Sequence, residues 1–470
     1  MAIPTPSACS AAARLLLAAL LGATVACAGG GPASLALPAH DGPILIITVE
    51  GLRPDVVGAF GGSPSVTPHL DRLASEATWA GTAIAPSSWV LPSAASLLTG
   101  LRPWQHQAIS NLERTLSPDL VTFAEALGEL GYRSRAYHDC PDLSPAYGYG
   151  QGLEGVLALR RGGRAAADLK GLQGGRELVW AHLELPSPPY VRREALAGGQ
   201  PPAPPGLPRR ASGTALEMYF DPATPLPAAR RAQLFALYRY NAAAADAMIG
   251  RLLAGLDGSG RRADTLIVVT SLFGQEFGEH GQITQGGNLG RALIEVPLVV
   301  VLPRSFPRPL AAPPGGRVAL ARLWATLVEA AGGKAPPGVA PSLFHAAPRG
   351  VLSELYQAAG NNEVSFVEGD EQLRWVTRFA DPGADFFAVR LAAIGAGRDG
   401  AERQLFRARQ DVLHRRFTAV PPLAGDGSRP RLLLERWTAG GVASVDDPER
   451  AAELARRLST AFSLFVEPSS

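Results

Sequence analysis

The segment Ser87–Gly100, SSWVLPSAASLLTG, has the composition of a loop that enters a helix, because hydroxyls, a proline and small residues precede an apolar run. Backbone N–H groups and the helix dipole at such a helix start favour an anion, so an enzyme could seat a nucleophile there. Ser93 lies one helical turn after Val90 and is a candidate nucleophile if the segment is helical. The alternative for Ser93 is a capping or packing role, which is the commoner one for small residues at a helix start.

Acidic residues and a histidine stand in two further segments. Glu50 ends the run ILIITVE, and Glu276, Glu279 and His280 lie within QEFGEHG. A hard cation prefers several carboxylate or carbonyl oxygens, so these groups could in principle rebuild a metal site. A lone carboxylate at a strand end more often binds backbone N–H groups or a neighbouring arginine such as Arg53, and we expect structural roles for these four residues.

The elements that position these residues are predicted from hydrophobic patterns. Four short apolar runs rich in β-branched residues begin at Ile44, Leu178, Thr265 and Val296. Helical patterns beginning at Thr67, Thr122 and Arg231 lie between them. The alternation predicts an α/β fold, a mainly parallel sheet with helices on both faces. In such a sheet the ligand crevice lies beyond the carboxyl ends of the strands, where we expect Glu50 and Ser271.

The C-terminal part of the chain follows another pattern. LRWVTRF, FFAVRLA and RLLLERW alternate like strands of a small antiparallel sheet, and DPERAAELARRLSTAFSLF predicts a terminal amphipathic helix. We expect a signal peptide at 1–26, a tether at 27–42, a large domain at 43–345 and a C-terminal subdomain at 346–470. The proline-rich segment Gly198–Gly213 is predicted to be a surface insertion in the large domain.

Several segments together resemble the sulfatase family of the alkaline phosphatase superfamily. ILIITVEGLRPDVVGAFGG is similar to its first strand and metal loop, LPSAASLLTGLRP to its nucleophile segment, and ADTLIVVTSLFGQEFGEHG to its second metal loop. The resemblance implies the α/β fold of that family and a divalent cation, usually calcium, held by Asp, Asn or His side chains. It also implies a Cys or Ser in a CxPxR pattern that is oxidised to formylglycine and attacks a sulfate ester.

The nucleophile segment departs from that family pattern. Pro92 sets the alignment with CxPxR, which places Val90 at the nucleophile and Ala94 at the arginine. Valine has no heteroatom and cannot be oxidised to an aldehyde. Ser187 and Gln285 stand at two further positions where relatives carry histidine.

The two metal loops depart from the pattern as well. The first loop has Glu50 and Gly51 where the family has an Asp pair or Asp-Thr, and the second has Leu272 and Phe273 where two ligands belong. Apolar side chains cannot donate to a cation. Although calcium is expected for the family, we therefore predict no cofactor for this chain.

The N-terminal sequence predicts export. One basic residue, Arg14, precedes the apolar run Leu15–Ala26, as in a secretory signal. Cys27 ends TVAC, which resembles a bacterial lipobox, and is the predicted lipid-attachment residue; ordinary cleavage after Ala28 is the alternative. Cys140 would be the one thiol left to fold with the mature chain, so no disulfide framework is expected and a buried structural role is the commoner one for it.

Charge gives no indication of a nucleic-acid partner, because 44 Lys and Arg nearly balance 42 Asp and Glu. Membrane contact is predicted through the N-terminal lipid, which places the chain in a bacterial cell envelope. We interpret the sequence as that of a pseudoenzyme that binds an unidentified envelope ligand or protein. The alternative is an active sulfuric or phosphoric ester hydrolase that uses Ser93 or a rebuilt metal site.

Overall fold

The computed structural model of the protein describes residues 39–463, apart from 110–113, 191, 193–205, 208, 210–226, 281–282, 305, 307–308, 312–315, 347–349, 357–360, 379–430 and 439–440. These residues belong to one compact unit, Ala39–Ser470. The predicted signal peptide, Cys27, the predicted strand FFAVRLA and most of the proline-rich segment lie outside the described residues. No helix in the described part of the chain is long and apolar enough to cross a membrane.

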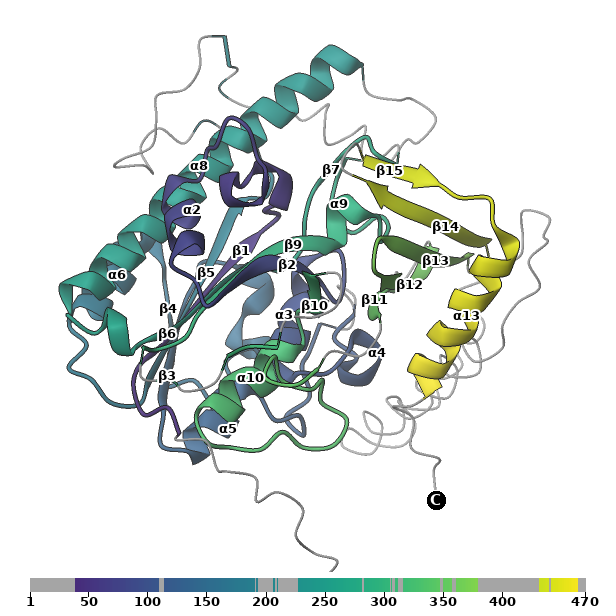
Figure 1. Ribbon diagram of the computed structural model, residues 1–470. Coiled ribbons are helices and arrows are strands. Elements are labelled where there is room, and N and C mark those ends of the chain that lie inside the picture. The colour runs from purple at the N-terminus through teal and green to yellow at the C-terminus, as the bar shows by residue number, and fades with distance from the viewer. Residues whose placement is uncertain are drawn as a thin grey trace, which may run out of the picture. The chain divides into compact units, whose positions relative to one another are not determined.

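Among the described residues, eight strands form the central sheet in the order β10-β2-β9-β6-β1-β5-β3-β4 (Figure 1). They are β1 Ile44–Glu50, β2 Trp79–Ile84, β3 Arg133–Tyr137, β4 Gly155–Leu157, β5 Glu177–Pro186, β6 Leu266–Ser271, β9 Glu295–Val301 and β10 Arg317–Ala319. β1 pairs in parallel with both β5 and β6, which confirms the predicted α/β class.

One strand of the central sheet, β9, runs opposite to its neighbours β2 and β6. If β9 ran parallel to β6, the chain would have to cross from the carboxyl end of β6 back to the opposite end of the sheet, usually through a helix. The connection between β6 and β9 instead begins and ends at the same end of the sheet. The N–H of Gly274, near its start, bonds the carbonyl of Leu293, near its end, at 2.7 Å. It contains the short strands β7 Glu276–Phe277 and β8 Ile283–Thr284 and one turn of helix, α9 Arg291–Ile294.

Helices cover both faces of the central sheet (Figure 1). Successive residues of the buried strand β1 point to opposite faces, so this strand packs against the helices on each side. Ile44 and Ile46 join the hydrophobic cluster formed with α3 Val90–Thr99, α5 Phe123–Glu129 and α10 Arg322–Ala330. Leu45, Ile47 and Val49 join a second cluster formed with α2 Pro68–Ser75, α6 Gly163–Lys170 and α8 Ala228–Gly258. β1 is therefore held from both sides, which fixes the position of Glu50 at its end.

Five antiparallel strands form a separate sheet, called here the small sheet, in the order β11-β12-β13-β14-β15. They are β11 Val351–Leu355, β12 Asn361–Glu368, β13 Glu371–Arg378, β14 Arg431–Thr438 and β15 Gly441–Ser444. The predicted terminal helix is α13, Pro448–Ser463, and its Leu454 and Leu458 pack with Trp375 and Leu434 of the sheet. Trp104 of the short helix α4, Pro103–His106, belongs to the same cluster, so a segment that follows α3 packs against the small sheet.

Short 3₁₀ segments complete the connections. They are η1 Pro54–Val56, η2 Gly58–Phe60, η3 Pro141–Leu143, η4 Pro145–Tyr147, η5 Arg160–Gly162 and η8 Arg262–Asp264.

Candidate functional site

The two segments that resemble metal loops lie side by side, as expected for strands whose carboxyl ends meet at one edge. Val49 of β1 is opposite Ser271 of β6, so the residues that follow them leave the sheet together. The N–H of Leu272 bonds the carbonyl of Val49 at 2.9 Å, and the hydroxyl of Ser271 accepts from the N–H of Leu52 at 3.0 Å. These bonds hold the first loop, residues 51–53, to the end of β6 and the second loop, residues 272–294, to the end of β1.

Leu272 and Phe273 occupy the interior of the protein. Both are fully buried and belong to the same hydrophobic cluster as Val90 and Ala94. Fully buried side chains fill this place and cannot line a crevice open to solvent. Calcium takes six to eight oxygen ligands, and none of these four side chains carries one. The residues present therefore do not fit the calcium ion that the resemblance implied.

A network of neutral amides and hydroxyls surrounds Gly51. The amide nitrogen of Gln275 lies 3.3 Å from Ser187 Oγ and donates to Gln285 Oε1 at 2.9 Å, and the Tyr190 hydroxyl donates to Gln275 Oε1 at 3.1 Å. Gly51 has a positive φ of 73°, and a Cβ there would lie 2.7 Å from Gln275 Nε2. Three positions that depart from the family pattern, Gly51, Ser187 and Gln285, thus meet around Gln275.

Sequence reasoning did not identify Gln275. The sequence feature that could have indicated a role for this residue is its position, since it is a polar residue directly after the TSLFG segment, at the carboxyl end of a predicted buried strand. Its side chain is fully buried, and its carbonyl accepts from Arg53 at 2.9 Å. A buried amide of this kind is satisfied by neutral partners and needs no ion.

The nucleophile segment forms α3, which begins at Val90. Val90 is 8% exposed, whereas Ser93 is fully buried and its hydroxyl donates to the carbonyl of Ser87 at 3.1 Å. An activated serine needs a general base within hydrogen-bond reach. Ser93 has a backbone carbonyl in that position, so its surroundings favour the capping and packing role.

Glu50 is held by a histidine and a cysteine. Its carboxylate lies 2.9 Å from His182 Nε2, and Cys140 Sγ is 3.6 Å from the same oxygen. The expected pair with Arg53 is wrong, because the pairing of β1 with β5 is irregular at Glu50, which lies opposite Pro186. A group on the β5 side of the sheet therefore becomes its partner.

Arg53, the last residue of the first loop, pairs with Asp55 at 2.6 Å and with Glu279 at 2.5 Å. Both carboxylates are at or near the surface, so these ion pairs hold the first loop at the surface, whereas Glu50 lies in the interior and pairs with His182.

The surroundings of Glu50 are aromatic and buried. His182 Nδ1 lies 2.9 Å from Thr48 Oγ1, which also accepts from the indole N–H of Trp180 at 2.9 Å. Burial lowers the pKa of His138, which packs beside Trp180, to about 4. Burial, together with the charge of Glu50, raises the pKa of the Cys140 thiol. His138 is thus neutral, and the thiol keeps its proton when no cation is present.

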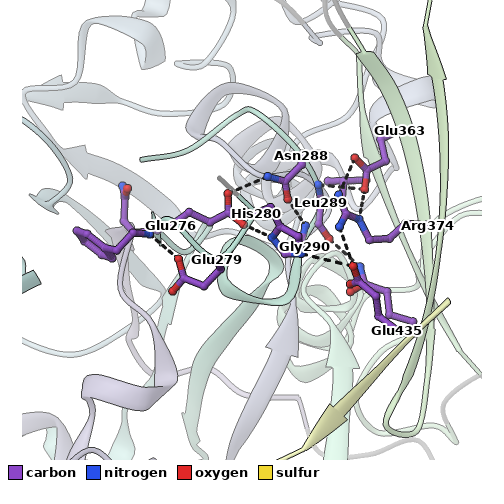
Figure 2. A network of polar contacts seen from close by, with 12 residues as sticks. Glu276, Glu279, His280, Asn288, Leu289, Gly290, Glu363, Arg374 and Glu435 are labelled. Atoms are coloured by element: carbon purple, nitrogen blue, oxygen red, sulfur yellow. Dashed lines mark hydrogen bonds and ion pairs between the residues drawn. The ribbon is translucent and has the colours of Figure 1, made fainter. Parts of the chain in front are cut away.

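The second loop also carries a network that reaches the small sheet (Figure 2). His280 Nδ1 bonds Glu276, and its Nε2 lies 3.4 Å from Glu435 of β14. Burial acts to lower the pKa of His280, but the hydrogen bonds to Glu276 and Glu435 outweigh it and raise the pKa to about 9. Arg374 of β13 extends the network and binds Glu435 at 3.0 Å. Glu276 and His280 therefore join the loop to the small sheet, in agreement with the predicted structural roles.

Comparisons with known proteins agree with this architecture. A sequence model of the family Sulfatase matches residues 43–143. An N-acetylgalactosamine-6-O-sulfatase from Bacteroides thetaiotaomicron is 34% identical over 93 residues, which cover 19% of this chain and 18% of that protein. The aligned part thus spans less than a fifth of that relative.

Solved structures show the fold over much more of the chain. A putative sulfatase from Bacteroides thetaiotaomicron has a TM-score of 0.57 at 16% identity and covers 79% of this chain and 94% of its own. A phosphonate monoester hydrolase from Agrobacterium radiobacter has a TM-score of 0.52 at 17% identity and covers 86% of this chain and 100% of its own. The N-terminal part of the chain, residues 43–143, is thus similar in sequence to the Sulfatase family, and the chain shares its fold with solved sulfatase structures.

Proposed function

We propose that this chain is a catalytically inactive member of the sulfatase family that acts as a binding or scaffold protein of the bacterial cell envelope. The observation that supports this proposal is that apolar, buried side chains stand at the positions expected for metal ligands and for the nucleophile. Leu272, Phe273 and Val90 take the places of two ligands and the nucleophile, and they belong to one hydrophobic cluster.

The physical reason is the cost of an empty metal site. Several carboxylates that face one another without a cation would leave buried, uncompensated charge, which costs several kcal/mol. Apolar side chains in the second loop remove that cost, and the remaining carboxylate, Glu50, pairs with His182. The resulting site is stable without calcium. It lacks the cation that would screen the charge of an ester and the heteroatom that would attack it.

The cellular place of the protein is part of the same proposal. The apolar run before Cys27 supports export and lipid attachment, and a lipid chain on that cysteine would hold the protein at a membrane surface. We propose no nucleic-acid partner, and the bound ligand is an unidentified molecule or protein of the envelope.

The hydrolase alternative finds no support around Ser93, because its hydroxyl faces a carbonyl, nor around Glu276, because its carboxylate is engaged by His280 and Asn288. We therefore do not propose a second function.

The experiment is an assay of the purified full chain with an aryl sulfate, an aryl phosphate and an aryl phosphonate monoester, each with added calcium. We expect no turnover above that of a matched Ser93→Ala preparation. Added calcium should also leave the melting temperature unchanged, since a ligand that binds the native state raises it by mass action. Saturable turnover that Ser93→Ala abolishes, or a calcium-dependent rise in melting temperature, would overturn the proposal.

A further inference from the structure

Three potential metal ligands of different chemistry meet in the interior of the sheet. Glu50 ends β1, His182 lies within the neighbouring β5, and Cys140 follows β3, the next strand along. Their exposed fractions are 7%, 0% and 6%. One ligand atom from each lies within 4.8 Å of the other two, and no other group of three His, Cys, Asp or Glu side chains meets this condition in the described part of the chain.

We propose that Glu50, Cys140 and His182 form a binding site for a divalent metal ion of the zinc class. Tetrahedral bonds of zinc to sulfur, nitrogen and oxygen place the ligand atoms about 3.4–3.6 Å apart. The distance from Cys140 Sγ to Glu50 Oε1 is 3.6 Å, and that from His182 Nε2 to the same oxygen is 2.9 Å. The histidine and the carboxylate would need to separate by only about 0.5 Å to admit the ion.

The ligand types select the metal. Calcium and magnesium prefer oxygen ligands, whereas a thiolate with an imidazole and a carboxylate suits zinc and similar transition metals. The site uses Glu50, the one carboxylate that remains at the four expected ligand positions, and adds His182 of β5 and Cys140, which follows β3. It thus shares one position with the calcium site that the resemblance implies and differs from it in the other ligands.

The histidine is already oriented for such a role. A metal-bound histidine usually donates its second N–H to a neighbouring group, which fixes the ring. Thr48 Oγ1 lies 2.9 Å from His182 Nδ1 and is itself fixed by the Trp180 indole N–H. A hydroxyl can donate or accept, so Thr48 can accept the Nδ1 proton and leave the lone pair of Nε2 for the ion.

A second, independent feature points to a missing group. His138 is only 6% exposed, and its ring has a polar contact with the backbone of Cys140 that falls short of good hydrogen-bond geometry; neither ring nitrogen has a partner of good geometry among the described residues. Its ring lies at 80° to that of His182, with centroids 6.3 Å apart. Buried polar atoms are normally paired, because leaving them unpaired is costly. An additional polar group next to His182, such as an ion and its bound water, would give His138 a partner.

Metal binding here displaces protons in a balanced way. The ion displaces the thiol proton of Cys140 to solvent; the neutral imidazole of His182 carries its proton on Nδ1 and binds through the Nε2 lone pair, and Glu50 binds as the carboxylate. No redox step or co-reactant is needed. The inference goes beyond the proposed function and does not depend on it, because a metal can bind here whether or not the protein hydrolyses an ester.

The test uses the full chain, purified without chelator and analysed for metals by mass spectrometry. We expect about one zinc ion per chain. After the metal is removed, Co²⁺ should bind and give the near-ultraviolet charge-transfer band of a cobalt–thiolate bond. Cys140→Ser should abolish that band, and His182→Gln should weaken Zn²⁺ affinity at least about tenfold.

The matched control is His106→Gln, since His106 is an equally buried histidine whose partner is Ser96. It should keep the cobalt band. If the ligand variants fail to fold, Thr48→Val keeps all three ligands, removes the hydroxyl that orients His182 and accepts from Trp180, and should weaken Zn²⁺ affinity about 10- to 100-fold. Wild-type protein without zinc that also gives no cobalt band, or a band that persists in Cys140→Ser, would overturn the proposal.

Discussion

His280 provides a quantitative test of how the second loop is attached to the small sheet. Replacing it with glutamine keeps a polar side chain but removes the positive charge between Glu276 and Glu435. The side chain of His280 is 22% exposed, so solvent screens the interaction only in part. The perturbation therefore removes an ion pair that connects the second loop to β14.

The magnitude follows from the pKa of His280, which rises from the ordinary value of 6.5 to about 9. One unit of pKa corresponds to about 1.4 kcal/mol, so the charged histidine contributes up to about 3 kcal/mol to the free energy of unfolding. Because the folded-state pKa is raised, this contribution is fully present below pH 6.5 and is lost as the pH rises through about 9. Arg374, the neighbouring cation, acts in the opposite direction and limits the effect.

The assay is denaturant unfolding of wild type and His280→Gln at several pH values between about 6 and 10. The variant should be less stable than wild type by up to about 3 kcal/mol at the acidic end, and the two should converge at the alkaline end. His345→Gln is the matched control, because His345 also pairs with a glutamate, at 3.0 Å, but its side chain is 52% exposed. That variant should follow the wild-type curve closely. Parallel pH profiles for wild type and His280→Gln would refute the reasoning.

Three further predictions concern the core, the first loop and the N-terminus. Phe273→Ala should lower the free energy of unfolding by about 3–5 kcal/mol through lost burial and a cavity, and a cost like that of the exposed control Val121→Ala would contradict its place in the core. Gly51→Ala should cost about 2 kcal/mol or more, because φ is 73° and the new Cβ has no room, whereas Gly61→Ala, with φ of 99° and open space, should cost less; equal losses would argue against the packing around Gln275. Cys27→Ala should move the protein from membranes to the soluble exported fraction in cell fractionation, and a soluble wild type beginning at Gly29 would disprove lipid attachment.

Much of the fold could be predicted from local patterns in the sequence. The β-branched runs at Ile44, Leu178, Thr265 and Val296 are strands because such runs suit a sheet covered on both faces, and the helices between them follow from apolar spacing. The direction of β9 could not be predicted, because an apolar run is compatible with either direction. The connection that decides it depends on contacts such as that between Gly274 and Leu293.

The sequence by itself determined which residue types stand at the positions expected for the nucleophile and for the metal ligands. The side chains of Val90, Leu272 and Phe273 have no atom that could bind calcium or attack an ester in any fold. Only the tertiary structure decided what surrounds those positions. The thiol of Cys140, the imidazole of His182 and the carboxylate of Glu50 are separated by tens of residues in the chain, and they meet because β3, β5 and β1 are neighbours in the sheet. The order of strands is set by packing across the whole domain, so no local pattern around any of the three residues could have indicated that they lie together.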